Sequence, residues 1–158
     1  MSNVSIDTNG KLIIEDARLL YRNFAGAQTD YNAPGKRNFN VIIDDPDLAQ
    51  KMADDGWNVK IRPARDPQEP SIHHIKVNVN FNSARGPRIF MHTGNSMVEL
   101  TEQTVGQLDQ ADIIGCDLVI SPYRYERNGN AGLSAYLDTM HVVIKEDPFA
   151  HKYANLEG

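Results

Sequence analysis

Basic and aromatic side chains alternate along this chain in a pattern that suits a binding surface. The aromatic residues that lie among its lysines and arginines are Tyr21, Phe24, Tyr31, Phe39, Trp57, Phe81, Phe90, Tyr123 and Tyr125. Cationic grooves follow a phosphate backbone, and aromatic rings stack on unpaired bases with little regard to sequence. The combination predicts a surface for unpaired nucleic acid.

The charge of the chain is sorted into blocks. The formal net charge is -5, yet residues 18–40 carry +3 and residues 57–92 carry +4, whereas residues 44–55 carry -4 and residues 99–117 carry -5. The basic blocks have the pattern of strands and the acidic blocks that of helices. Because binding follows the local field rather than the total charge, an acidic protein with a basic sheet can still bind a polyanion.

Residue patterns typical of catalysis or metal binding are weak. The chain has neither a phosphate-binding loop nor a glycine-rich dinucleotide fingerprint. His73 and His74 are neighbours in a strand, so their rings point to opposite faces and do not readily share a metal. A nuclease would need carboxylates such as Asp44, Asp45, Asp54 and Asp55. We interpret them as helix-capping and solvated residues, and predict no enzyme activity, no metal and no cofactor.

Hydrophobic periodicity places these residues on a mainly β framework. Strands are expected over residues 12–24, 37–43, 57–62, 74–81, 88–93, 116–127 and 133–145. Two short helices are expected, one after Asp44 or Asp45 with Pro46 at its first position, and one from Thr101 to about Gln110. Asn128-Gly129 between two strands is a strong hairpin signal. The predicted fold is an oligonucleotide-binding (OB)-like antiparallel Greek-key barrel with two short helices.

The bulk properties predict one soluble domain. At 158 residues the chain suits a single domain, with a core over about residues 11–145, a flexible start at 1–10 and a tail at 146–158. The single cysteine, Cys116, excludes an internal disulfide and fits a reducing compartment. We see no secretory signal and no apolar run long enough for a membrane span, so we expect a cytoplasmic location without membrane partners.

The polar faces of the strands supply the candidate binding residues. Lys60 and Arg62 share one face of their strand, and Lys76 shares a face with Asn78 and Asn80. Should these faces coincide, they would form a stripe for a phosphate backbone; the alternative is an ordinary solvated sheet face. The full set of predicted nucleic-acid-binding residues is Arg22, Phe24, Lys36, Arg37, Lys60, Arg62, Lys76, Arg85, Arg88, Tyr123, Tyr125 and Arg127.

The last hairpin carries the clearest aromatic pair. Tyr123 and Tyr125 lie two residues apart on one face, with Arg127 beside them, while the next strand turns Leu133 and Leu137 to the core. The two tyrosines could stack on bases, or they could be ordinary cross-strand packing. Both interpretations stay open at this point.

Five segments in order resemble a family of phage-encoded single-stranded DNA-binding proteins with the OB fold. They are Ala17–Phe24, Gly35–Val41, Asp54–Lys60, Asp117–Tyr123 and Gly132–Leu137. The resemblance covers most of residues 12–145 and implies cooperative, sequence-independent binding to single strands during phage DNA replication or recombination, in the cytoplasm of an infected bacterium. Such proteins often end in an acidic tail that recruits partners. Here Glu146-Asp147-Pro148-Phe149 is followed by a mixed stretch, which departs from that pattern.

We therefore predict a single-stranded DNA-binding protein. RNA stays open as an alternative ligand, and replication or recombination proteins and a second copy of the chain stay open as partners. The alternative function is a phage interaction or inhibitor protein that binds a host or phage protein through the same face. Salt separates the two, because nucleic-acid binding weakens steeply as salt rises.

Overall fold

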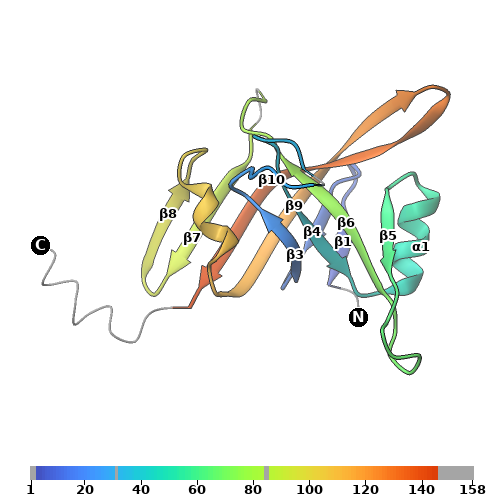
Figure 1. Cartoon of the computed structure of the whole chain (residues 1–158), viewed down its shortest axis with the longest axis horizontal. Coiled ribbons are helices and arrows are strands. Elements are labelled where there is room, and N and C mark those ends of the chain that lie inside the picture. Colours follow the sequence, from blue (N-terminus) through green and yellow to red (C-terminus); the bar gives the residue numbers. More distant parts are fainter. Residues whose placement is uncertain (1–2, 31, 84–85, 146–158) are drawn as a thin grey trace, which may run out of the picture.

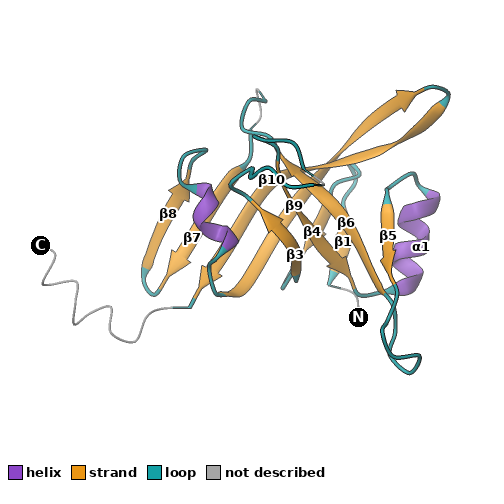
Figure 2. Cartoon of the chain, in the orientation of Figure 1, coloured by secondary structure: helices purple, strands orange, loops and turns teal. Residues whose placement is uncertain are grey.

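The computed structural model describes residues 3–30, 32–83 and 86–145, and these form one sheet system with little helix (Figure 2). The elements follow in the order β1 (Val4–Ile6), β2 (Leu12–Ile14), β3 (Leu19–Asn23), β4 (Arg37–Ile43), α1 (Pro46–Asp54), β5 (Val59–Arg62), β6 (Ile72–Val79), β7 (Arg88–Thr93), β8 (Ser96–Leu100), the 3-10 helix η1 (Val105–Asp109), β9 (Ile113–Arg127) and β10 (Asn130–Ile144). In this described part no helix is long and apolar enough to cross a membrane.

Five strands form a partly open barrel with the neighbour order β3–β4–β6–β10–β9 (Figure 1). All of these neighbours are antiparallel except β6 and β10, which run parallel. Between β3 and β9 the described residues form no ladder; the Ala17 amide, just before β3, donates to the Cys116 carbonyl of β9 at 2.7 Å. The predicted mainly β, OB-like architecture is confirmed, with the barrel left open at this seam.

The remaining elements extend this barrel. The β1–β2 hairpin joins β9, β5 joins the edge of β6, and the β7–β8 ribbon joins β10. Within the segment 1–10, β1 pairs with β2 and Val4 is buried in the core. The expected tail, residues 146–158, lies outside the described residues.

Two elements differ from the sequence-based expectation. The segment after Thr101 forms only the short helix η1, where Gly106 packs so closely on Ala25 that an added Cβ would lie 3.1 Å from the Ala25 Cβ. Strand β8 was not predicted at all. Its signal was Gly94-Asn95, a two-residue turn between two strand-like runs, with Gly94 at φ +57°.

Helix α1 forms as its sequence predicts. Asp45 is the N-cap, and its carboxylate accepts the Asp47 and Leu48 amides at 3.0 and 3.3 Å, with Pro46 at the first helical position. Met52 is fully buried, and Gly56 ends the helix with φ +107°. Trp57 then enters the core and leads into β5.

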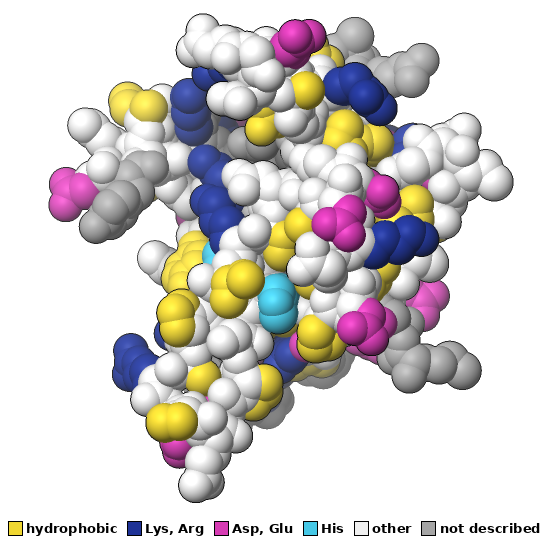
Figure 3. Space-filling model, turned by 90° about the vertical axis from the view of Figure 1, so that its right-hand side faces the viewer, with side chains coloured by type: hydrophobic (Ala, Val, Ile, Leu, Met, Phe, Trp, Pro, Cys, Tyr) yellow, Lys and Arg dark blue, Asp and Glu magenta, His cyan; other side chains and the backbone are white. Residues whose placement is uncertain are grey.

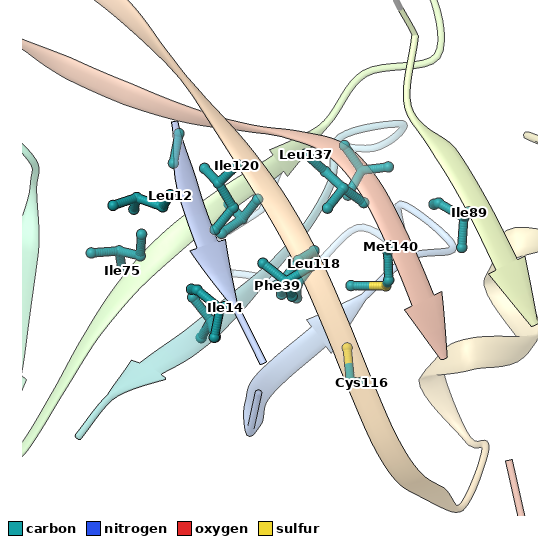
Figure 4. Packing of buried hydrophobic residues seen from close by; sticks show 14 of the residues in the cluster. Leu12, Ile14, Phe39, Ile75, Ile89, Cys116, Leu118, Ile120, Leu137 and Met140 are labelled. Carbon is teal, nitrogen blue, oxygen red and sulfur yellow. The ribbon is translucent and has the colours of Figure 1, made fainter. Parts of the chain in front are cut away.

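The inner faces of the barrel strands, together with β2 and β7, make one apolar core (Figure 4). Its fully buried members include Leu12, Ile14, Phe39, Ile75, Ile89, Ile120 and Met140. Since side chains alternate across a strand, filling the inside with these residues sends their polar neighbours to the outside. The core therefore determines which side chains form the outer surface described below.

Cys116 lies in this core, and we expect its thiol to be unreactive in the folded protein. It is 2% exposed, and burial, with a smaller contribution from Asp117, raises the pKa of its thiol to about 12. The thiolate is the reactive form, so at pH 8 we expect a thiol reagent to modify the native protein only as fast as it unfolds. Modification in urea should be immediate. Rapid, stoichiometric modification of the folded protein would contradict the burial.

Candidate nucleic-acid interface

Strand register places the predicted basic side chains on one outer surface of the sheet. Lys60 lies opposite His74, Arg62 opposite Ile72, and Asn40 opposite Lys76. Directly opposed residues point to the same face, so the faces of β5 and β6 coincide, as the stripe requires. We call this surface the polar face; its members are Asn38, Asn40, Lys60, Arg62, His74, Lys76, Asn78, Tyr123, Tyr125, Arg127, Ser134 and Tyr136.

The β9–β10 hairpin carries the tyrosines of the polar face and projects beyond the barrel (Figure 1). Asn128 and Gly129 both have positive φ, +50° and +81°, which is the geometry of a two-residue hairpin turn that follows the strand twist. The predicted hairpin is confirmed. Its register places Tyr123 opposite Ser134 and Tyr125 opposite Gly132.

Glycine at position 132 makes room for the Tyr125 ring. A Cβ added to Gly132 would lie 2.6 Å from the Tyr125 hydroxyl oxygen and 2.8 Å from the ring carbon that bears it. The ring therefore lies across the glycine backbone, and 36% of the residue remains exposed. Tyr123 is 63% exposed and contacts Tyr136 edge to face, with ring centroids 5.9 Å apart. Neither tyrosine is a core residue.

A groove of about 440 Å³ lies between β6, the start of β5 and the hairpin. Its lining joins the basic stripe to the aromatic pair: Trp57, Asn58, Ile75, Lys76, Asn78, Tyr123, Tyr125, Arg127, Leu133, Ser134, Ala135 and Tyr136. In the described part of the chain β10 pairs with β6 at Ala135 and Tyr136 alone, and nearer the hairpin Leu133 bridges to Trp57 instead. The Asn78 side-chain amide donates to the Ala135 carbonyl at 3.1 Å across the β6–β10 junction.

A second depression, about 750 Å³, continues beyond Tyr123 and Tyr136, which line both spaces. Asn9, Asn80 and Ser121 contribute polar groups to it. Its basic residue, Lys11, is already paired with Asp138 at 2.6 Å. The cationic character is therefore concentrated in the first groove and on β5.

The cations of the polar face have no acidic partner among the residues that the structure describes. The ion pairs in this part of the chain are Lys11–Asp138, Arg18–Asp44, Arg37–Glu102 and Arg88–Glu99. Lys60, Arg62, Lys76 and Arg127 are exposed and belong to none of them. The end of the molecule that carries α1, β5 and the hairpin shows a column of Lys and Arg side chains (Figure 3). Unneutralised positive charge of this kind attracts phosphates.

His74 is the cross-strand neighbour of Lys60 on the polar face. It is 7% exposed, and its Nδ1 lies 2.8 Å from the Asn40 Oδ1. Burial, and then Lys60 and Arg62, lower the pKa of the His74 imidazole below its usual 6.5. The imidazole is therefore mostly neutral at pH 7, and it lies beside Lys60 on the polar face. Because the folded-state pKa is lowered, His74 should destabilise the fold as the pH falls below about 6.5.

Three of the predicted arginines lie outside the polar face and already form hydrogen bonds or ion pairs within the protein. The Arg22 guanidinium donates to the Leu108 and Ala111 carbonyls, both at 2.8 Å, and so holds η1. Arg37 pairs with Glu102 at 3.6 Å. Arg88 pairs with Glu99 on the β7–β8 ribbon and lies over the Phe90 ring. None of the three lines the groove.

Phe24 is not a base platform, which corrects the sequence-based expectation. Its side chain is fully buried and stacks on Phe39 with ring centroids 5.1 Å apart. Arg22-Asn23-Phe24 and Arg37-Asn38-Phe39 lie side by side, with Asn23 opposite Asn38, and both phenylalanines are buried. Lys36 is exposed at the end of the loop before β4, and Arg85 lies outside the described residues.

Tyr136 and Asn58 line the groove and were missing from the predicted set. Tyr136 alternates with the buried Ala135 and Leu137, so strand periodicity could have placed it outward. The candidate metal carboxylates are dispersed: Asp45 caps α1 and Asp44 contacts Arg18. No group of three or more His, Cys, Asp or Glu side chains within residues 3–30, 32–83 and 86–145 could hold a metal ion.

Comparison with known proteins gives a family and a fold. The model of a family described as a putative phage ssDNA-binding domain matches residues 1–157. The single-stranded DNA-binding protein from bacteriophage Enc34 in complex with ssDNA superposes with a TM-score of 0.59 at 13% identity over 94% of each chain. A second structure of the Enc34 protein gives 0.57 at 14% identity, over 100% of this chain and 96% of that one. No curated protein matches the chain.

Proposed function

Because this chain belongs to the family of putative phage single-stranded DNA-binding domains, we propose that it binds single-stranded DNA on its polar face. The observation that carries the choice of surface is the groove of about 440 Å³, where Lys76 and Arg127 meet Tyr123 and Tyr125. A cationic track with rings beside it is what binding without sequence preference needs. The likeness to the Enc34 protein in complex with ssDNA supports single-stranded DNA as the ligand.

The arrangement favours single strands over duplex. The tyrosine rings can stack only on bases that are not already paired and stacked, and each such contact is typically worth about 1–3 kcal/mol. Residues 44–55 and 99–117, which include α1 and η1, carry -4 and -5, and this local negative charge disfavours phosphates at those segments. A duplex would make the phosphate contacts but not the stacking.

The biological role follows from the family. We propose a non-catalytic protein that covers single-stranded phage DNA during replication or recombination inside the infected bacterium. Replication or recombination proteins and further copies of this chain are the expected partners, and RNA is the competing ligand to be tested.

Fluorescence anisotropy with labelled oligo-dT and a duplex of equal length tests the function. We expect tight binding of oligo-dT, weaker binding of the duplex, and a steep loss of affinity as salt rises. An oligo-U arm measures the preference for DNA over RNA. Equal affinity for single strand and duplex, or no binding of either at low salt, would refute the proposed function. Salt-independent capture of a protein partner would favour the interaction-protein alternative.

The basic pair on β5 gives a quantitative prediction. We expect Lys60→Ala combined with Arg62→Ala to weaken oligo-dT binding. The plot of log affinity against log salt should flatten by roughly 0.7 for each phosphate that the protein no longer neutralises. Both side chains are exposed and unpaired among the described residues, so the melting temperature should not fall.

The matched control is Arg124→Ala combined with Lys145→Ala, which removes the same charge away from the polar face. Arg124 lies opposite Leu133, on the other side of the hairpin, and Lys145 follows the end of β10. The control should lower the affinity slightly at most and leave the slope unchanged. An unchanged slope in the Lys60 and Arg62 variant, with the protein well folded, would make this pair an ordinary solvated face.

A further inference from the structure

A backbone irregularity in β3 places one more aromatic ring on the polar face. Leu20 lies opposite Asn40 and Asn23 opposite Asn38, so β3 uses one residue more than β4 over this stretch. An inserted residue of this kind is a β-bulge, which commonly redirects side chains beside functional sites. Here Arg22 turns to the carbonyls at η1, while the Tyr21 ring reaches His74 with centroids 5.8 Å apart.

The conformation of Tyr21 is unfavourable for its residue type. Its φ is +52°, in the left-handed region that bulky side chains rarely adopt. Little packing compensates for this, because Tyr21 remains 57% exposed and its ring meets His74 only at an edge, with an interplanar angle of 68°. Strained backbone persists where the surrounding structure enforces it, and such positions cluster at ligand-binding sites.

We propose that Tyr21 is a second stacking platform, at the far end of the strand path from Tyr125. The path would cross the sheet from β9 over β10, β6 and β4 to β3, following the neighbour order of the strands. Four strand spacings of about 4.8 Å make this path at least roughly 19 Å long, and it is longer where the groove separates β6 from the hairpin. On this path Lys76 of β6 lies opposite Asn40. Lys60 lies opposite His74, whose ring contacts Tyr21.

This inference rests on the proposed function, and two variants separate the two claims. Tyr21→Gly removes the ring and also suits the positive φ, so the melting temperature should stay within a few degrees of wild type. Affinity for a 15-nucleotide oligo-dT should fall about 5- to 150-fold, which corresponds to the removal of one stacked base. Affinity for a dT dinucleotide, which is too short to reach both rings, should fall much less when measured by competition. Tyr21→Phe keeps the ring and should bind like wild type.

The outcomes are distinct. If Tyr21→Gly binds the 15-mer like wild type while Tyr125→Ala weakens it, the second platform is refuted and the proposed function stands. If wild type binds and neither variant weakens binding, this inference is refuted and neither tyrosine is a platform; the Lys60 and Arg62 variant then decides whether the polar face binds DNA at all. If Tyr21→Gly and Tyr21→Asn, which also tolerates this φ, both lower the melting temperature by more than about 10 °C, Tyr21 is a structural residue and the inference fails. A loss of affinity in Tyr21→Phe as large as in Tyr21→Gly would exclude stacking.

Discussion

Phe24→Ala is expected to destabilise the protein by about 3–5 kcal/mol, the usual cost of truncating a large buried aromatic side chain. Phe24 is fully buried and stacked on Phe39. Its amide also donates to the Asp109 carboxylate at 2.6 Å, next to the Ala25 amide at 3.1 Å, so its surroundings join β3 to η1. A cavity here would loosen the core and this junction together.

Urea unfolding and thermal melting measure the effect. At roughly 2–4 °C for each kcal/mol in a chain of this size, the melting temperature should fall by about 6–20 °C. Well below that temperature, oligo-dT affinity should be near wild type, because Phe24 does not reach the polar face. Lys36→Ala, an exposed change in the adjoining loop, is the control and should leave stability unchanged. A stable Phe24→Ala protein that no longer binds would restore Phe24 as a base platform.

Phe24 also shows where sequence reasoning fails. The local sequence Tyr21-Arg22-Asn23-Phe24 does not show whether the Phe24 ring faces water or the core, because the direction of the ring depends on the bulge at Tyr21. Alternation predicted β6 and the hairpin correctly, because Val77 and Ile120 must be buried and their neighbours must then face outward. An irregular strand has no such periodicity. The sequence therefore predicted Arg22 and Phe24 of this segment as binding residues and missed the exposed Tyr21.

The basic residues also divide into those whose surroundings the sequence predicts and those whose surroundings depend on the fold. Lys60, Arg62, Lys76 and Arg127 were predictable because regular strands and a recognisable turn place them. Arg22 and Arg37 have the same chemistry, but their partners, the Leu108 carbonyl and Glu102, are more than sixty residues away in the sequence. A sequence shows which residues are cationic. The fold decides which of those cations are already neutralised or hydrogen-bonded, and only the remaining ones are available to a phosphate backbone.

Tyr125→Ala is the variant that tests the groove most directly. Stacking of one base on the ring predicts a loss of about 1–3 kcal/mol in oligo-dT affinity, with little change in stability because Tyr125 is 36% exposed and rests on the Gly132 backbone. Core packing predicts the reverse, a large loss of stability and unchanged affinity in the folded protein. Melting temperature and affinity measured on the same variant therefore distinguish the two roles.

Two further variants show whether the ring or its position matters. Tyr125→Phe retains the stacking surface and should bind within a few-fold of wild type. Gly132→Ala retains the tyrosine but places a Cβ where the ring now lies, 2.6 Å from the hydroxyl oxygen; a side-chain end can move, so we expect a folded protein with a displaced ring and reduced affinity. Should Tyr125→Ala and Gly132→Ala both bind oligo-dT like wild type, the hairpin would not be a platform. Binding would then depend on Lys60, Arg62 and Lys76 alone, through phosphate contacts that cannot by themselves distinguish a single strand from a duplex.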